Sequence, residues 1–297
     1  NLDEMFNAAD QYPVDFREVR GQMHAKRAIE VATAGAHNLL MVGPPGSGKT
    51  MLAQRLPGIL PPLSAEEMLQ VASLHSLAGR RPAWSTERPF RQPQHTASLA
   101  AMIGGGLGMR PGELSLAHAG VLFLDELPEF ARDTLESLRE PLESGLVLLS
   151  RIKRLREYPA RFQLIAAMNP CPCGYFGDPR GRCRCTAEQV RRYRGKLSGP
   201  LLDRIDLQVE LRAVPAAALL SSDGAAGEPS AEVAARVLAA RNLQLDRQGK
   251  LNARLATAEL GAHCTLDEVG RRFMEQAIAR LGLSARGYDR VLRVART

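Results

Sequence analysis

The sequence predicts an α/β fold in which a parallel sheet is flanked by helices and followed by a small C-terminal α-helical lid domain. Two observations lead to this prediction. Short apolar runs at 38–42, 120–127 and 164–167 alternate with helical segments, which is typical of buried parallel strands joined by helices. The composition then changes, and beyond residue 230 only helical patterns are found.

The first elements surround a glycine-rich loop. Residues 23–35 predict an amphipathic helix with Gly35 as its C-cap, and residues 38–42 predict a short strand. The loop and a second helix follow. Ser64, with Glu67 three residues later, forms a capping-box pattern that predicts the start of another helix.

The middle of the chain supplies two buried strands and a hairpin. Residues 120–127 form an apolar run that ends in acidic residues, as expected of a strand buried on both faces. A helical segment ends at Gly145, and residues 146–162 predict a strand, a basic turn and a second strand. Residues 164–167 then predict another buried strand.

The last part of the chain is expected to be a separate domain. Residues 221–230 are rich in glycine, serine and proline and predict a linker between an α/β domain at 1–220 and a helical domain at 231–297. Three helices are expected there: residues 231–247, a helix that begins at the capping box of Thr265 and Glu268, and a helix from Ser284 to the end.

The overall composition favours an anionic partner. Hydrophobic residues make up 45% and charged residues 24% of the chain, and the formal net charge is +7. No apolar run approaches the roughly 20 residues that cross a bilayer, and no signal-peptide pattern opens the chain. We therefore expect a cytoplasmic protein with no membrane partner. Because the sequence does not begin with Met, we expect it to be part of a longer chain.

The segment GPPGSGKT matches the phosphate-binding P-loop pattern in full, between a predicted strand and a predicted helix. Backbone N–H groups and the helix N-terminus supply positive potential for phosphate oxygens. Lys49 is expected to neutralise the β and γ phosphates of ATP, and the Thr50 hydroxyl to hold Mg²⁺. The candidate nucleotide-binding residues of this loop are Gly43, Pro44, Pro45, Gly46, Ser47, Gly48, Lys49 and Thr50.

Polar residues end the next two buried strands. Asp125 follows the apolar run at 120–124, where a second Mg²⁺ ligand is needed, and Glu126 is expected to orient the attacking water. Two solvated acids that cap a strand are the alternative. Asn169 ends the following strand, and its amide can bridge the γ-phosphate and the water. A P-loop combined with an Asp–Glu pair favours hydrolysis over binding alone.

These motifs, with DFREVRGQ upstream and a helical domain downstream, resemble those of AAA+ ATPases. The stretches GELSLAHAGVLFLDELPEF, LREPLESG, YPARFQLIAAMNPCPCG and GPLLDRIDLQVEL are similar to the Mg-chelatase-like ComM family, relatives of magnesium chelatase and of MCM replicative helicases. The resemblance covers nearly the whole chain. It implies a ring, normally a hexamer, and ATP-driven branch migration on DNA in natural transformation and recombination. It also implies an N-terminal Lon-like domain, which we expect to lie outside this sequence.

The resemblance also implies roles for residues outside the P-loop. Arg204 in LLDRID matches the arginine that such motors present in trans to the γ-phosphate of the adjacent subunit, a contribution of about 10³ to 10⁵ in rate. An ion pair with Asp203 or Asp206 is the alternative for Arg204. Val19 and Gln22 match the segment that lines the adenine pocket.

A second arginine is implied in the last helix. Arg286 in SARGYDRVLR matches the sensor-2 arginine, with Arg290 and Arg293 one and two turns further on as alternatives. The chain departs from the family at PQHT, where PHHS is expected. His95 is therefore assigned no role.

The turn of the predicted hairpin is strongly basic. In MCM-like motors the matching hairpin projects into the central pore, and cationic groups suit sequence-independent contacts with DNA phosphates. A solvated basic turn is the alternative. The glycine-rich segment 101–113 is either a second pore loop or an ordinary loop. The candidate DNA-binding residues of the hairpin are Arg151, Lys153, Arg154 and Arg156.

Four of the five cysteines form two C-x-C pairs within the loop 170–186: Cys171, Cys173, Cys183 and Cys185. Four thiolates on Zn²⁺ make a closed structural site, and zinc binding of roughly 10 kcal/mol or more can fold a loop that has little apolar content. A redox or disulfide role and unliganded thiols are the alternatives. Because seven basic residues lie at 180–196, we hypothesise that zinc pins a basic loop between Asn169 and Arg204, where subunits meet.

The sequence as a whole favours an ATP-hydrolysing ring motor that remodels branched DNA. The first alternative is a magnesium-chelatase-like motor that acts on a protein partner, and the second is a non-catalytic ATP-dependent scaffold. The basic hairpin and basic loop favour DNA over the first alternative. Glu126 argues against the second, since a scaffold needs no residue that activates water.

Overall fold

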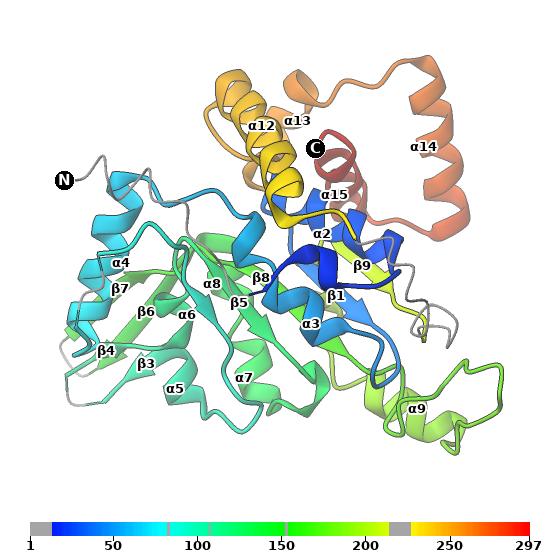
Figure 1. The fold of residues 1–297 in the computed structure, drawn as a ribbon, viewed down its shortest axis with the longest axis horizontal. Helices are drawn as coiled ribbons and strands as arrows, with labels where there is room; N and C mark the ends of the chain where they lie inside the picture. The colour runs from blue at the N-terminus through cyan, green and yellow to red at the C-terminus, as the bar shows by residue number, and fades with distance from the viewer. Residues whose placement is uncertain (1–13, 82–83, 107, 152–153, 214–226) are drawn as a thin grey trace.

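A parallel sheet forms the centre of the molecule. In the computed structural model of the protein, the described residues are 14–81, 84–106, 108–151, 154–213 and 227–297. Within them, five parallel strands are arranged in the order β2-β5-β8-β1-β9 (Figure 1). The strands are β1 (Leu39–Val42), β2 (Phe90–Arg91), β5 (Val121–Leu124), β8 (Gln163–Met168) and β9 (Leu207–Glu210). The predicted α/β fold class is confirmed.

The three central strands are buried on both faces because they carry apolar residues at successive positions. Leu40, Leu122 and Leu164 belong to one hydrophobic cluster, which includes α7 and α8. Their neighbours Met41 and Phe123 point to the opposite face and belong to a second cluster with α2, α3 and α12. Two hydrophobic layers thus fix the sheet, and the strand ends are fixed with it.

Helices and short 3-10 turns connect the strands. The helices before the C-terminal region are α2 (Met23–Gly35), α3 (Lys49–Gln54), α4 (Ala65–Leu77), α5 (Leu99–Ile103), α6 (Glu113–Leu116), α7 (Arg132–Glu136), α8 (Arg139–Ser144), α9 (Ala187–Arg194) and α10 (Gly199–Leu202). The 3-10 turns are η1 (Phe16–Glu18), η2 (Pro57–Ile59), η3 (Leu127–Glu129) and η4 (Asn252–Arg254).

Two helix ends test the capping expectations. The capping box of Ser64 and Glu67 is present at the start of α4. Gly35 is not the C-cap of α2, because Ala36 takes the left-handed conformation with φ of 57°. Glycine is required at position 35 for another reason, because a Cβ there would lie 2.2 Å from Nε2 of His37.

Two antiparallel pairs lie beside the sheet. β6 (Leu146–Arg151) and β7 (Arg154–Pro159) form a hairpin, and β3 (Gly104–Gly105) pairs with β4 (Arg110–Pro111) within the glycine-rich segment. The Tyr158 hydroxyl donates a hydrogen bond of 2.7 Å to the Met109 carbonyl and so joins the two pairs. Lys153 lies outside the described residues, as do the side chains of Arg151 and Arg154.

The C-terminal region is helical, as predicted, with α12 (Ser230–Gln248), α13 (Thr257–His263), α14 (Glu268–Leu281) and α15 (Ala285–Ala295). Figure 1 shows these helices together, from yellow to red. The expected capping box at Thr265 is wrong, because Asp267 caps α14 and accepts from the Gly270 N–H. Helix α13 was not predicted. No helix in the described part of the chain is both long and apolar enough to span a bilayer.

Candidate functional site

The P-loop curls between the end of β1 and the start of α3. Gly46 and Gly48 have φ of 76° and 92°, a region that L-residues rarely adopt. Gly43 has no room for a side chain, since a Cβ there would lie 2.7 Å from the Leu211 carbonyl oxygen. The glycines of the motif are therefore required by backbone geometry at these three positions.

Lys49 lies inside this curl. Its Nζ donates to the carbonyl oxygens of Gly43 (2.7 Å) and Pro44 (3.0 Å) and to Oδ1 of Asn169 (3.2 Å). Burial lowers the pKa of Lys49, and the negative charges of Asp125 and Glu126 oppose that effect. The P-loop lysine and the amide that ends β8 are thus in direct contact, although 120 residues separate them.

Two oxygen ligands for a hard cation lie beside the lysine. Thr50 Oγ1 donates a hydrogen bond of 2.6 Å to Asp125 Oδ2. A hydroxyl and a carboxylate are the donor types that Mg²⁺ takes in P-loop proteins, so this pair fits the ion. Glu126 follows with φ of 53°, a strained conformation for a non-glycine residue, and its side chain is half exposed.

His95 also belongs to this edge of the sheet, although sequence reasoning gave it no role. Its Nδ1 lies 3.6 Å from Glu126 Oε2, and the two residues line a pocket of about 360 Å³. Only the departure at PQHT drew attention to His95. Nothing in its spacing indicated Glu126, which comes from a separate strand.

The segment predicted to border the adenine contacts the P-loop from the side. Gln22 Nε2 donates to the Ser47 carbonyl (3.1 Å) and to the Arg212 carbonyl (2.7 Å). Val19 is buried in the hydrophobic cluster that supports β1. Of the two residues, Gln22 therefore contacts the P-loop directly.

The two predicted arginines lie at the opposite edge of the sheet. Arg204 precedes β9 and Arg286 opens α15, and both line a pocket of about 570 Å³. Because β9 is parallel to β1, residues before β9 lie at the end of the sheet away from the P-loop. The structure therefore does not bring either arginine to the P-loop of its own chain.

Within that pocket the Arg204 side chain has two partners among the described residues. It pairs with Glu143 and donates to the Pro200 carbonyl, and not to Asp203 or Asp206 as the alternative expected. Arg286 is exposed, and its side chain makes no hydrogen bond with another described residue.

The other two arginines of α15 are tied up in the fold. Arg290 donates to the Leu202 and Ile205 carbonyls and contacts Asp203, and Arg293 donates to the Leu255 carbonyl. Of the three candidates for the sensor-2 arginine, Arg286 is the one whose guanidinium is free among the described residues.

The candidate DNA contacts are only partly described. Arg156 is exposed on β7, with its guanidinium 3.5 Å from the Tyr158 hydroxyl. Among the four candidates, Arg156 is the residue whose side chain the structure describes.

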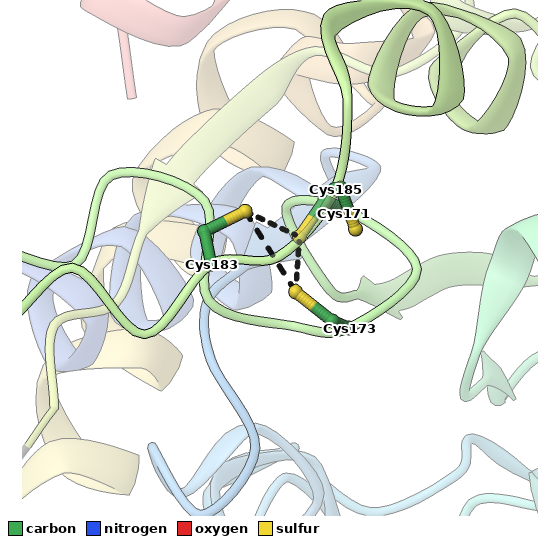
Figure 2. Close-up of side chains that lie close together, drawn as sticks. All are labelled: Cys171, Cys173, Cys183 and Cys185. Atoms are coloured by element: carbon green, nitrogen blue, oxygen red, sulfur yellow. Dashed lines mark hydrogen bonds between the residues drawn. The ribbon is translucent and has the colours of Figure 1, made fainter.

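The four cysteines converge. Figure 2 shows the sulfur atoms facing a common centre, and all four lie within 4.8 Å of one another. The sulfur of Cys171 is 3.4 Å from that of Cys173 and 3.8 Å from that of Cys183. Four thiolates on a tetrahedral metal with bonds of about 2.3 Å lie about 3.8 Å apart, so this set can hold a metal ion. Backbone N–H groups of Arg184 and Tyr175 lower the pKa of Cys173 to about 6, whereas burial and the neighbouring sulfur atoms of Cys173 and Cys171 raise the pKa of Cys183 and of Cys185. The cluster without a metal therefore favours one thiolate over four.

A P-loop after β1, an Asp–Glu pair after β5 and an amide after β8, all at one edge of a parallel sheet, define a nucleotide-binding protein of the AAA+ class. The chain belongs to the magnesium chelatase family. Residues 15–219 match the family described as magnesium chelatase, subunit ChlI, and residues 227–297 match the C-terminal family of the same subunit. The family implies ATP and Mg²⁺ as ligands, in agreement with the donor set of Thr50 and Asp125.

Similar curated proteins place the chain within this family more closely. Uncharacterized protein YifB of Salmonella typhimurium is 54% identical over 286 residues, which cover 95% of this chain and 56% of that protein. Competence protein ComM of Haemophilus influenzae is 47% identical over 293 residues, 98% of this chain and 57% of that protein. The magnesium-chelatase 38 kDa subunit of Cereibacter sphaeroides is 26% identical over 222 residues, 67% of this chain and 59% of that protein.

The predicted resemblance to the ComM family is thereby confirmed. The chain spans a little over half the length of the curated relatives it matches.

Proposed function

We propose that this chain is the motor part of an ATP-hydrolysing ring, normally a hexamer, that remodels branched DNA in the cytoplasm. The observation that carries the proposal is the division of the site between two edges of the sheet. Lys49, Thr50 and Asp125 lie at one edge, and Arg204 and Arg286 lie at the other. A complete site therefore needs a second copy, whose arginines meet the first copy's P-loop.

At the P-loop edge each residue has a task that follows from its contacts. Bound Mg²⁺ supplies positive charge that neutralises the phosphates, and Thr50 and Asp125 would hold it. Lys49 exchanges its bonds to Gly43 and Pro44 for phosphate oxygens, at little reorganisation cost because its amine already lies inside the loop. Glu126 and Asn169 border the same space from neighbouring strands, where they orient and polarise water.

At the other edge Arg204 is available to a neighbouring subunit. It forms an ion pair with Glu143, and the Arg204 side chain is 16% exposed whereas that of Glu143 is 65% exposed. Because the carboxylate partner lies in solvent, the pair contributes on the order of 1 kcal/mol. A triphosphate presented by another subunit carries more charge than Glu143 and competes with it effectively. The free guanidinium of Arg286 in the same pocket strengthens the attraction.

DNA as the partner is supported by charge and by similarity. The net charge is +7, Arg156 is exposed on the hairpin, and the similar protein of Haemophilus influenzae is named as a competence protein. Branch migration in recombination and natural transformation is the activity that combines a competence-related protein with an ATP-driven ring.

Mixing two inactive variants tests the shared site. Lys49→Ala and Arg204→Ala should each abolish ATP turnover alone. In a 1:1 mixture about one interface in four pairs an intact P-loop with an intact Arg204, so roughly a quarter of the wild-type turnover should return. A mixture that stays inactive while rings still assemble would contradict the shared site.

ATP turnover with branched, single-stranded and duplex DNA tests the partner. Strong stimulation by branched or single-stranded DNA is expected. The second candidate is a motor that acts on a protein partner, favoured by the similarity to the magnesium-chelatase 38 kDa subunit. Turnover that is indifferent to every DNA would support that candidate instead, and a Glu126→Gln variant with full turnover would remove Glu126 from the hydrolysis step.

A further inference from the structure

The cysteine loop, residues 170–186, touches the P-loop. Gly174 has φ of 85°, and a Cβ at this position would lie 2.5 Å from Cδ and 2.7 Å from Cγ of Pro45. The backbone of the cysteine loop therefore lies directly on the proline ring of the nucleotide loop. Two segments that are 120 residues or more apart in sequence share one contact surface.

A second connection runs through Asn169. This residue lies two positions before Cys171, and its side chain accepts a hydrogen bond from Lys49. Cys171 is fully buried, and its sulfur accepts from the Phe176 N–H at 3.3 Å. The first cysteine is therefore rigidly placed, next to the residue that borders the P-loop lysine.

The rest of the loop has no hydrophobic core of its own. Phe176 is 47% exposed, and between Cys171 and Cys185 the described residues other than Gly174 are only partly buried or exposed. Arginine side chains stack on the two aromatic rings: Arg182 lies 4.1 Å from the centre of Tyr175, and Arg194 lies 5.1 Å from that of Phe176. These contacts lie at the surface and contribute little, which leaves the four sulfur atoms as the strongest means of holding the loop in place.

We propose that the four cysteines bind one Zn²⁺ ion, and that the metal-bound loop braces the P-loop through Gly174 and Asn169, so that zinc binding and nucleotide binding strengthen each other. Without the metal, the loop loses its cross-link and Pro45 loses the surface on which it rests. Coupling of this kind is reciprocal: zinc raises nucleotide affinity by the same factor by which nucleotide raises zinc affinity. The coupling rests on the proposed function only in requiring that the P-loop binds nucleotide; it requires neither DNA nor a ring.

The metal site is tested first, without nucleotide. The purified chain should contain one zinc per molecule. Replacement of zinc by Co²⁺ should give the absorption of a tetrahedral tetrathiolate, and a Cys173→Ser Cys183→Ser variant should lose both signals. Less than half an equivalent of zinc after incubation with equimolar Zn²⁺ would overturn the site, as would a disulfide found by thiol counting in freshly purified protein.

The coupling is tested by binding of a fluorescent ADP analogue to the full chain, with and without zinc. Removal of zinc should weaken binding at least about fivefold, the lower end of measured coupling between sites. Equal affinities in the two states would overturn the coupling. A chain that binds zinc but no nucleotide in either state would overturn the proposed function, whereas the metal measurement above is unaffected by that result.

Two glycines of the loop provide a matched pair of variants. Gly174→Ala should keep zinc and lose the coupling, because the new methyl group collides with Pro45. Gly177 has φ of 82° and nothing within 4 Å of an added Cβ, so Gly177→Ala imposes the same backbone strain without the collision. Gly177→Ala should retain both zinc and the coupling. If both variants retain the coupling, the Gly174–Pro45 contact is not its route and the proposed bracing is wrong.

Discussion

The two edges of the parallel sheet differ in how their charged residues are satisfied. At the edge where the strands end, Lys49, Thr50 and Asp125 contact one another or nearby backbone within the chain. At the edge where the strands begin, Arg286 has no described partner and Arg204 has only Pro200 and the exposed Glu143. One edge is therefore organised by the chain itself, whereas at the other Arg204 and Arg286 have few partners among the described residues. This difference is the basis for the proposal of a site shared between two copies.

The largest expected effect distinguishes the contribution of Arg204 to ATP turnover from that of Lys49 to nucleotide binding. Arg204→Ala should lower ATP turnover by about 10³-fold or more while nucleotide affinity stays within a few-fold, since this arginine acts on the transferring phosphate of another subunit. Lys49→Ala should lose nucleotide binding as well. Turnover and fluorescent-nucleotide binding measured on the same preparations check both. An Arg204→Ala variant that no longer binds nucleotide would erase the distinction.

Lowering the pH should reduce the free energy of unfolding through His118, which lies where the strands begin. His118, before β5, donates from Nε2 to Oε1 of Gln70 (2.8 Å), and its Nδ1 accepts from the Arg161 N–H (3.1 Å). Burial first, and then the charge of Arg161, lower the pKa of His118 to about 4. Since the unfolded value is about 6.5, the unfolded state takes up the proton first, and stability falls by up to about 3 kcal/mol as the pH drops from 6.5 to 4.

Urea unfolding of the wild type and of His118→Gln between pH 7 and pH 4 measures this contribution. The wild type should lose more stability than the variant, and the difference isolates His118 from the carboxylates that titrate in the same range. Parallel curves for the two proteins would show that His118 does not contribute.

The hairpin joins the sheet at the same outward-facing edge, just before β8. Arg156→Ala should reduce the slope of log affinity for DNA against log salt by about 1, a loss of roughly eightfold in affinity at 0.1 M relative to 1 M salt. Arg272→Ala removes another exposed arginine, on α14, and serves as the control. Salt titrations with a labelled branched DNA compare the two variants with the wild type. Identical slopes for Arg156→Ala and the wild type would mean that Arg156 does not contact DNA.

The smallest effect should come from Glu143. Glu143→Gln releases Arg204 from its only described ion pair, so ATP turnover should rise, by no more than about fivefold, because an exposed pair contributes up to about 1 kcal/mol. Steady-state turnover at saturating ATP measures the change. A decrease would mean that Glu143 positions Arg204 instead of competing for it.

The three central strands, the hairpin and the P-loop edge of the site could be predicted from the sequence because their signals are local, whereas the two-residue strand β2 and the edge strand β9 were not predicted. The P-loop motif fixes Lys49 and Thr50, and an acid or amide directly after a buried strand must lie at the edge where parallel strands end. The relation of Asp125 and Asn169 to the P-loop follows from topology alone. Their position beside the P-loop could therefore be predicted without any knowledge of the distances between them.

Contacts between distant segments could not be predicted in the same way. Nothing in the sequence indicates that His95 faces Glu126 or that Glu143 holds Arg204, since neither pair has a periodic spacing. Local rules also failed where tertiary contacts competed: Gly35 was expected to cap α2, yet it is needed for its close approach to His37, and Ala36 takes the left-handed conformation instead.

The hydrogen bond from Tyr158 to Met109 has a mechanical consequence. It joins the β6–β7 hairpin to the residue that precedes β4, and Met109 and Tyr158 also pack in the same hydrophobic cluster, so we expect the two antiparallel pairs to move together. In the proposed motor, a force that DNA exerts on the hairpin would therefore also displace the β3–β4 pair.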